Sequence, residues 1–249
     1  MDSSLALGAG IVLRLIRCAR AGCGYIFLYR SVRNSCIMLR MKAKRSPKSI
    51  GRPRSFDEGK VLDRALQVFW RKGYEGASLS DLTAAMGIER PSLYAAFGDK
   101  AALFSRVLDR YQEGQAGYVR DAFQEPTARR VVERLFRSTI DASTDARHPR
   151  GCLLVQGALA CGSDADCVRR DLISRRAARE TLTRRRLQRA KAEGDLPADS
   201  DPPALARFII AVLHGMAVRS ASGASRKELR EIADMALRAW PREGREKRK

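Results

Sequence analysis

Few side chains in this sequence could act together as nucleophiles, general bases or metal ligands. The 2 histidines are His148, which precedes a proline, and His214, which lies in an apolar stretch. The 6 cysteines include no Cys-x-x-Cys pair, a usage that indicates a reducing cytoplasmic setting and no disulfide framework. We find no glycine-rich phosphate-binding loop. Because triads and metal centres need several such groups, the sequence argues against an enzyme and predicts no metal and no cofactor.

Three cysteines could nevertheless form a chemical switch. Cys152 follows Arg150 at an expected helix start, where the helix dipole and the arginine would both favour the thiolate. Cys161 and Cys167 flank a Gly-Ser-Asp turn and could approach each other. The alternative is that these cysteines are small apolar residues in a helical core. A thiol- or metal-responsive sensor therefore stays open as one interpretation.

The segment from Ser78 to Lys100 has the pattern of a helix-turn-helix. Ser78 and Asp81 have the spacing of a capping box at a helix start. Gly87 is the residue type that ends a helix in a left-handed conformation, and Pro91 suits the first turn of a second helix. Two short helices joined in this way can place one of them in a DNA major groove. A plain helical hairpin in an all-α core is the alternative.

The second of these helices has a face that serves no core. It carries Arg90, Ser92, Ala95 and Ala96, whereas Leu93 faces the first helix. Arg90 could bind guanine with two hydrogen bonds, and the two alanines would allow close approach to a thymine methyl group. We therefore expect this face to read bases.

A short basic stretch precedes the first long helix, which we expect to begin at Ser55 as its cap. Arg52 and Arg54 flank Pro53 in a pattern that resembles a minor-groove hook, where arginines follow a narrow, electronegative A·T groove. A solvated basic leader is the alternative.

Phe56 to Phe104 resembles the DNA-binding domain of TetR/AcrR-type transcriptional regulators. The motifs that carry this resemblance are Gly73-Tyr74, Gly87-Ile88, Leu93-Tyr94, Phe97 and Lys100. The sequence departs from the family at Glu89, where serine is frequent, and at Ala95 and Ala96, where bulky histidine or tyrosine is frequent. The resemblance implies phosphate contacts by Tyr94 and Lys100, with Ser78 as a further candidate. Base contacts cannot be copied from a relative because of the departures.

The same resemblance implies a homodimeric regulator, most simply a repressor, that binds a pseudo-palindromic operator in double-stranded DNA. A small-molecule effector in the C-terminal domain would move the fourth helix and change the spacing of the two DNA-binding heads. The last two helices would form the dimer interface, and we expect it to include Leu205, Phe208, Val212, Met216, Met235 and Trp240. Ordinary intrachain packing would give the same apolar pattern.

Charge is unevenly distributed along the chain. The formal net charge is +20, which favours an anionic partner such as nucleic acid. Residues 1–50 hold ten Lys or Arg against one acid, whereas residues 51–124 hold eleven against ten. The segment Ile11 to Leu39 could be a basic amphipathic helix at a membrane surface. We instead prefer a disordered or non-native extension over residues 1–49, and we expect no stable membrane association.

Helical periodicity continues to the end of the chain without a strand signal, so the sequence predicts an all-α protein. We expect a three-helix DNA-binding domain over residues 50–100, a helical ligand-binding and dimerisation domain over 101–241, and a basic tail over 242–249. Helices are expected at Pro126–Ser143, Gly151–Cys161, Ala165–Glu193, Pro202–Ser220 and Ser225–Trp240. The arginines of the third of these helices, which include Arg175, Arg179 and Arg186, are interpreted as a solvated face.

Pocket residues are expected in the middle of the C-terminal domain. The candidates are Phe104, Leu108, Phe136, Ile140, Cys152, Leu153, Gln156 and Leu159. We expect the protein to act in the bacterial cytoplasm at the nucleoid. A further alternative is an architectural protein that binds DNA without sequence preference through its basic leader and has no effector.

Overall fold

The computed structural model describes residues 5–7, 11–16, 27–32, 35–36, 56–159 and 165–241. For the first four of these ranges, and for residues 158 and 159, only the backbone is described. The chain divides into two units, residues 1–55 and residues 56–249. Arg52, Arg54, Cys161 and the basic tail lie outside the described residues, so the expectations made for them stay predictions.

The first unit contains an antiparallel sheet with the strand order β1-β2-β3-β4. Its strands are β1 (Leu5–Leu7), β2 (Ile11–Ile16), β3 (Phe27–Val32) and β4 (Ser35–Cys36). In the central pair, Leu13 lies opposite Arg30. The idea of one amphipathic helix from Ile11 to Leu39 is therefore wrong, because runs rich in β-branched and aromatic residues favour extended backbone. These strands lie within the range that we interpreted as an extension, and its natural origin stays a prediction.

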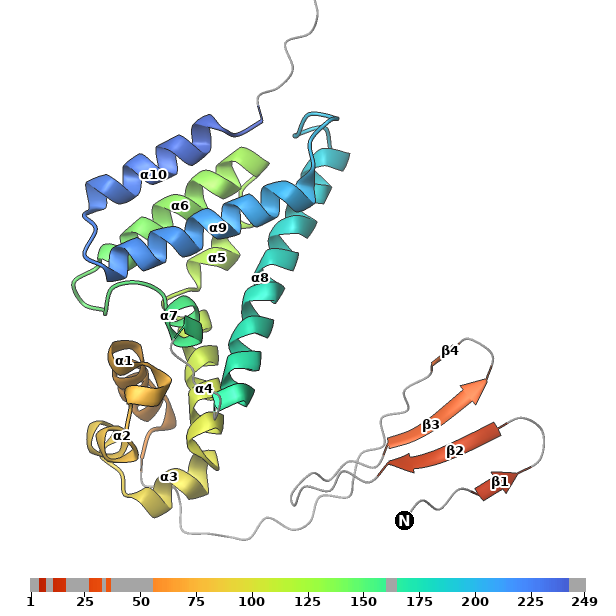
Figure 1. Cartoon of the computed structure of the whole chain (residues 1–249), viewed down its shortest axis with the longest axis vertical. Coiled ribbons are helices and arrows are strands. Elements are labelled where there is room, and N and C mark those ends of the chain that lie inside the picture. Colours follow the sequence, from red (N-terminus) through yellow and green to blue (C-terminus); the bar gives the residue numbers. More distant parts are fainter. Residues whose placement is uncertain are drawn as a thin grey trace, which may run out of the picture. The chain divides into compact units, whose positions relative to one another are not determined.

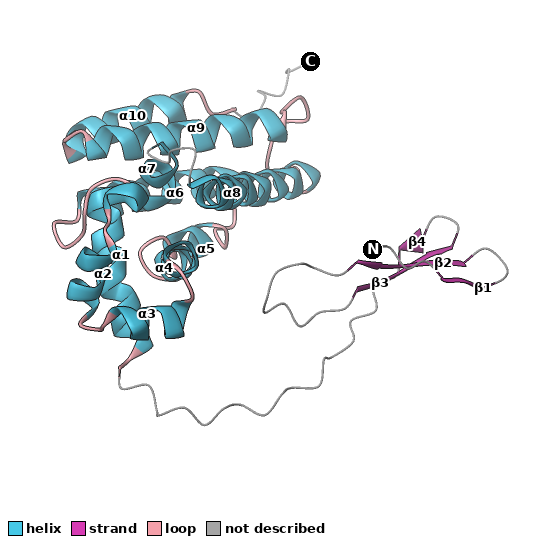
Figure 2. Cartoon of the chain, turned by 60° about the horizontal axis from the view of Figure 1, so that its bottom comes forward, coloured by secondary structure: helices cyan, strands magenta, loops and turns pink. Residues whose placement is uncertain are grey.

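The second unit is a bundle of helices, and the all-α fold class is confirmed there (Figures 1 and 2). The head consists of α1 (Glu58–Gly76), α2 (Leu79–Met86) and α3 (Arg90–Phe97). The remaining helices are α4 (Lys100–Glu113), α5 (Tyr118–Ala122), α6 (Ala128–Thr144), α7 (Leu153–Leu159), α8 (Asp166–Ala192), α9 (Pro202–Ala221) and α10 (Arg226–Arg238). The sequence did not indicate the short α5.

Local capping signals set most of the helix starts. Ser78 caps α2 with the expected capping box to Asp81, and Gly87 ends that helix at φ 68°. Asp99 caps α4 by accepting from the backbone N–H of Ala102. The expected cap at Ser55 is wrong: α1 begins later, and the carboxylate of Asp57 accepts the backbone N–H groups of the first turn. Ser55 and Asp57 both have side chains that could cap α1, and Asp57, which is nearer to the apolar stripe, is the cap.

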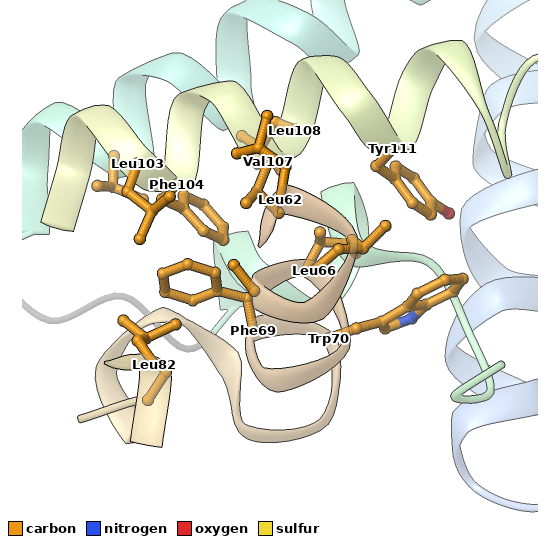
Figure 3. Packing of buried hydrophobic residues seen from close by; sticks show 14 of the residues in the cluster. Leu62, Leu66, Phe69, Trp70, Leu82, Leu103, Phe104, Val107, Leu108 and Tyr111 are labelled. Carbon is orange, nitrogen blue, oxygen red and sulfur yellow. The ribbon is translucent and has the colours of Figure 1, made fainter. Parts of the chain in front are cut away.

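Two apolar cores fill the second unit. The first joins α1, α2 and α3 to α4, α7 and the start of α8, with Phe69 and Phe104 packed edge to face at 4.9 Å between ring centroids (Figure 3). Leu153 and Leu172 belong to this core, so it continues from the head into the C-terminal half of the chain. The second core lies between α6, α9, α10 and the end of α8.

By length and composition, α9 is the one helix among the described residues that could cross a membrane. Its packing gives another reason for the apolar sequence. Ile209, Leu213 and Met216 are almost fully buried in the second core. The opposite face leaves Phe208 and Val218 exposed to about two-fifths.

The structure divides the expected dimer interface into two groups. Met216 and Trp240 are buried inside the chain, so they cannot supply an interface, because their side chains already fill the second core. Leu205 and Val212 are half-buried against that core. Phe208 and Met235 are exposed, and they remain the proposed contacts together with Val218, which the sequence did not single out. Large apolar side chains that stay exposed on α9 and α10 are candidates for contact with a partner.

Replacing Phe208 by glutamate tests this interface. We expect folded monomers with greatly weakened operator binding, because a carboxylate facing a second helix bundle would be buried without a partner. Sedimentation velocity and operator titration measure the two effects. Ile173→Glu is the matched control, since Ile173 on α8 is 42% exposed and Phe208 is 41% exposed. A Phe208→Glu protein that stays dimeric with wild-type operator affinity would place the interface elsewhere.

Candidate nucleic-acid interface and effector cavity

The recognition helix α3 has a buried face and an open face. Leu93 and Phe97 are buried against the head, whereas Ser92, Tyr94 and Ala95 are exposed. Ala96, which we expected on the open face, instead packs against the first core. A helical turn brings residue 96 round toward residues 93 and 97, so its methyl group points inward. The open face therefore ends at Ala95.

Arg90 begins this helix and is held in place by the helix before it. Its Nη2 donates to the Oγ of Ser80 at 2.9 Å. The interaction spans α2 and α3 and lies on the exposed side of the head. Glu89 occupies the N-cap position but makes no side-chain capping bond. The first turn of α3 thus leaves its backbone N–H groups for another acceptor, as expected of a helix that approaches phosphate or base edges.

Ser78 lies at the start of α2 and is tied into the capping box. Asp81 accepts from the backbone N–H of Ser78 at 3.0 Å, and Lys72 forms an ion pair with Asp81 at 2.7 Å. The hydrogen bonds from Lys72 and Ser78 lower the pKa of Asp81 to about 2. The carboxylate therefore stays ionised and keeps the helix start in position at physiological pH.

Lys100 is placed at the start of α4 beside an aromatic ring. Its Nζ lies 4.5 Å from the ring centroid of Tyr74, which itself follows the kink at Gly73 in α1. Burial lowers the pKa of Lys100, while Glu75 acts in the opposite direction. The cation–π contact orients the ammonium group without neutralising it, so Lys100 can still bind a phosphate.

Ion pairs connect α4 to the head. Arg106 pairs with Glu58, and Arg110 donates to both carboxylate oxygens of Asp63 at 2.8 and 2.9 Å. These two contacts join α4 to α1 along their exposed edge. Exposed pairs contribute little to stability, but two contacts one turn apart fix the relative rotation of the helices.

On its other side, α4 is held by an arginine of α8. Arg175 is only 16% exposed and donates to Asp109 at 2.6 Å and to Asp171 at 2.8 Å. It also donates to Ser105 and Gln112 of α4. The interpretation of the arginines of α8 as a solvated face is therefore wrong for this residue.

Two further arginines of α8 also point inward. Arg186 is 6% exposed and donates to the backbone carbonyls of Glu125 and Pro126. Arg179 has a buried Nη2 and lines a cavity. Residues 175, 179 and 186 are separated by four and seven positions, so they share one face of the helix. Because α8 contains many other arginines, the spacing of these three could not be recognised in the sequence.

The cavity beside Arg179 has a volume of about 20 Å³ and lies between the two apolar cores. Trp70 of α1 and Tyr111 of α4 border it from the head side, with their rings 4.9 Å apart and edge to face (Figure 3). Leu213 and Ala217 of α9 border it from the other side. Its remaining wall includes Ala142 and Val155 as well as polar side chains, among them Cys152, Tyr118, Thr139, Ser143 and His214.

The titratable groups around the cavity are strongly shifted. Burial raises the pKa of Tyr111 well above its usual value, with added contributions from Cys152 and Tyr118. Burial, Arg179 and Arg176 lower the pKa of His214 to about 4. Both groups are therefore neutral at pH 7, and such shifts gather at functional sites.

The structure separates most of the expected pocket residues. Phe104, Leu108 and Leu153 are buried in the first core, whereas Phe136 and Ile140 belong to the second. They do not line one pocket, because the helices that carry them form two different cores. Of the expected set, Cys152 lines the cavity. Gln156 has a buried Oε1 without a hydrogen-bond partner and packs against Gly151 in the cavity wall, and the side chain of Leu159 lies outside the described residues.

The cysteines that the structure describes in residues 56–159 and 165–241 are Cys152 and Cys167, and both are free. Cys167 is exposed, and Cys152 is half-buried at the cavity. Arg150 donates to the carbonyl of Ala224, and Arg179 lines the cavity together with Cys152; the expected influence of Arg150 on Cys152 stays a prediction. In the same described ranges, no group of three His, Cys, Asp or Glu side chains could hold a metal ion.

An exposed helix-turn-helix head on a helical body with a polar internal cavity defines a DNA-binding transcriptional regulator. Comparison with known families gives the same class. Residues 61–107 match the family described as bacterial regulatory proteins, tetR family, and residues 128–238 match the tetracyclin repressor-like C-terminal domain. The chain belongs to the TetR family, whose members act as dimers and bind small-molecule effectors.

Several relatives match over most of their length. The HTH-type transcriptional repressor ComR of Escherichia coli K12 is 35% identical over 196 residues, which is 78% of this chain and 93% of ComR. The repressor BdcR of the same strain is 31% identical over 79% of this chain and 95% of BdcR. A cysteine mutant of the regulator CifR, solved with 26-bp double-stranded operator DNA, is 44% identical with a TM-score of 0.74 and covers 76% of this chain and 100% of that chain.

Replacing Arg90 by alanine tests base reading. We expect discrimination at one base pair per half-site to fall by about 1–3 kcal/mol, the range for a bidentate arginine–guanine pair. Affinities for a panel of singly substituted operators, measured by fluorescence anisotropy, give this quantity directly. Equal losses on every operator variant would show that Arg90 contacts phosphate alone.

Lys100→Ala is the contrasting control for this experiment. Loss of a phosphate contact should weaken binding to operator and random DNA alike, and it should flatten the salt dependence by about one unit per half-site. A wild-type protein that binds both DNAs equally well would instead support an architectural role.

Proposed function

We propose that this protein is a homodimeric repressor of a pseudo-palindromic operator and that a small molecule entering the cavity releases it from DNA. Relatives that match over most of their length are named as repressors, and the CifR structure contains operator DNA. In this proposal the bases are read by Arg90, Ser92 and Ala95, and the phosphates are bound by Ser78, Tyr94 and Lys100. The relatives are transcriptional regulators and not enzymes. We propose the same for this chain, acting in the cytoplasm at the nucleoid.

One observation carries the effector proposal: the cavity borders the DNA-binding head and the C-terminal helices at once. Trp70 belongs to α1, and Tyr111 belongs to α4, yet both face a space whose far wall is α9. A volume of about 20 Å³ holds little more than a water molecule. An effector must therefore displace the wall, and the movable part of the wall includes two side chains that position the head.

The ion pairs of α4 would transmit a movement at the cavity to the DNA-binding head. A shift of Tyr111 moves α4, and Arg106 and Arg110 transmit the shift to α1. In a dimer, such a shift changes the separation of the two recognition helices and thus the fit to half-sites one helical turn apart. An effector that binds the displaced state better by about 3 kcal/mol would weaken operator binding by about 150-fold.

A substitution that fills the cavity should imitate the effector. Ala142 lines the cavity, and Ala142→Leu adds three carbon atoms there. We expect a folded dimer with operator affinity lowered in the absence of any effector, by as much as about 150-fold if the full coupling is used. Circular dichroism confirms folding, and fluorescence anisotropy measures affinity.

The control adds the same three carbon atoms outside the cavity. Ala178 is exposed on α8, so Ala178→Leu should bind operator like the wild type. If Ala142→Leu folds, dimerises and binds operator as the wild type does, the cavity is not coupled to the head and the proposal fails.

A thiol response is the second candidate function, favoured by the position of Cys152 in the cavity wall. Tyr111 interacts with Cys152, so a modified or oxidised thiol would disturb the same wall that a ligand would. Cys161 and Cys167 are the other proposed sensor thiols; Cys167 is exposed, and the placement of Cys161 lies outside the described residues.

Operator binding with and without a mild oxidant or a soft metal ion separates the two functions. The thiol response predicts release of the wild type by the reagent and retention of DNA by Cys152→Ser. A reversibly bound ligand predicts that both proteins keep their DNA under these conditions. Cys167→Ser tests the exposed thiol in the same way: release of DNA by this variant assigns the response to another cysteine, and retention assigns it to Cys167.

A further inference from the structure

Arg179 is the charged residue of the cavity lining, and its guanidinium group is only partly satisfied. Its buried Nη2 has no hydrogen-bond partner, and no carboxylate forms an ion pair with it in the part of the chain that the structure describes. One turn earlier on the same face, Arg175 has two carboxylate partners, Asp109 and Asp171. Neighbouring arginines of one helix therefore differ: Arg175 is paired with carboxylates, whereas Arg179 interacts with the hydroxyl group of Tyr118 and has no counter-ion among the described residues.

The charge of Arg179 persists in this position. Burial acts to lower its pKa, but Tyr118, Cys152 and Tyr111 raise it, and the net shift is upward. The neighbouring His214 is neutral at pH 7, because burial and the two arginines Arg179 and Arg176 lower its pKa to about 4. The cavity lining thus carries the guanidinium of Arg179 beside the neutral imidazole of His214 and the neutral phenol of Tyr111.

Arg179 is half-buried, and a buried guanidinium nitrogen without a partner is costly, so an anion that binds it would be stabilised there. A guanidinium group recognises a carboxylate through two parallel hydrogen bonds and a matching charge. A single cation suits a monoanion better than a phosphate dianion, since a second negative charge would stay unpaired. The apolar side chains of Leu213, Ala217 and Trp70 line the same space and would cover a hydrocarbon body.

We infer that the effector is a small monocarboxylate whose anionic end pairs with Arg179 and whose apolar part lies against Leu213, Ala217 and Trp70. This inference rests on the proposed function and names the chemical class of its ligand. Tyr118 and Thr139, whose hydroxyl groups lie 3.0 Å apart, supply further polar contacts in the wall. A groove lined by residues of α1 and α4 shares Gln115 with the cavity.

A first test needs no ligand. Arg179→Met keeps the length of the side chain and removes the unpaired charge, so we expect the melting temperature of the free protein to rise. Arg175→Met should lower it, because that substitution leaves Asp109 and Asp171 without their partner. An Arg179→Met protein that melts below the wild type would show that the cation is already satisfied in the free protein, and it would overturn the inference.

A second test uses straight-chain monocarboxylates from formate to octanoate, each compared with its neutral amide. We expect at least one acid to raise the melting temperature and release operator from the wild type about tenfold more effectively than its amide, the ratio that one charged hydrogen bond supplies. Arg179→Gln should lose this difference, whereas Arg185→Gln, at an exposed arginine of the same helix, should keep it.

The outcomes separate this inference from the proposed function. If acids and amides act equally, or no acid exceeds its amide, the anion inference is wrong even where small molecules release DNA. If Arg179→Met raises the melting temperature and acids bind, but neither acids nor Ala142→Leu alter operator affinity, the carboxylate site stands and the proposed release mechanism fails.

Discussion

The edge-to-face contact between Phe69 and Phe104 is the interaction on which the rest of the structure depends. Both rings are buried, and they join α1 of the head to α4. The same core continues through Leu153 of α7 and Leu172 of α8. Because close-packed interiors transmit displacement and absorb little of it, the head cannot tilt without a response from α4. Apolar packing already couples the positions of α1 and α4, and the ion pairs at their exposed edge add to this coupling.

The cavity owes its polarity to its place between two cores. Each core is closed by apolar side chains from its own helices, and the surfaces that meet between them include Tyr111, Thr139 and Arg179. Polar groups at such a boundary contribute less to stability than apolar packing would. The small cavity therefore lies where side chains of the head and of the C-terminal helices meet.

Local sequence signals were enough to predict the head. The capping box at Ser78 and the left-handed glycine at Gly87 each depend on residues three or four positions apart, and both are confirmed. The strands of the first unit were not predicted. A short apolar run such as Ile11–Ile16 is compatible with either a helix or a strand, and its periodicity does not distinguish them. The short α5 carries no capping signal to mark it.

The candidate site depended on contacts that the sequence does not reveal. Arg175 was interpreted as a surface residue because its partner Asp109 lies on α4, far away along the chain, and Arg179 because the other walls of its cavity come from distant helices. Most of the expected pocket residues were apolar, since apolar periodicity is what a single sequence displays. Periodicity finds cores, and Phe104, Leu108, Leu153, Phe136 and Ile140 proved to be core residues. A cavity lined by an arginine, phenols and a thiol gives no periodic pattern.

The division of α3 into a buried and an open face has a consequence for how such proteins diverge. Leu93 and Phe97 hold the helix in the head, while Ser92, Tyr94 and Ala95 make no contribution to the core. Substitutions at the three outward positions carry little cost in stability. After a gene duplication, the two copies can therefore drift toward different operators one residue at a time, with every intermediate still folded. The small alanine side chain leaves room for such changes in either direction.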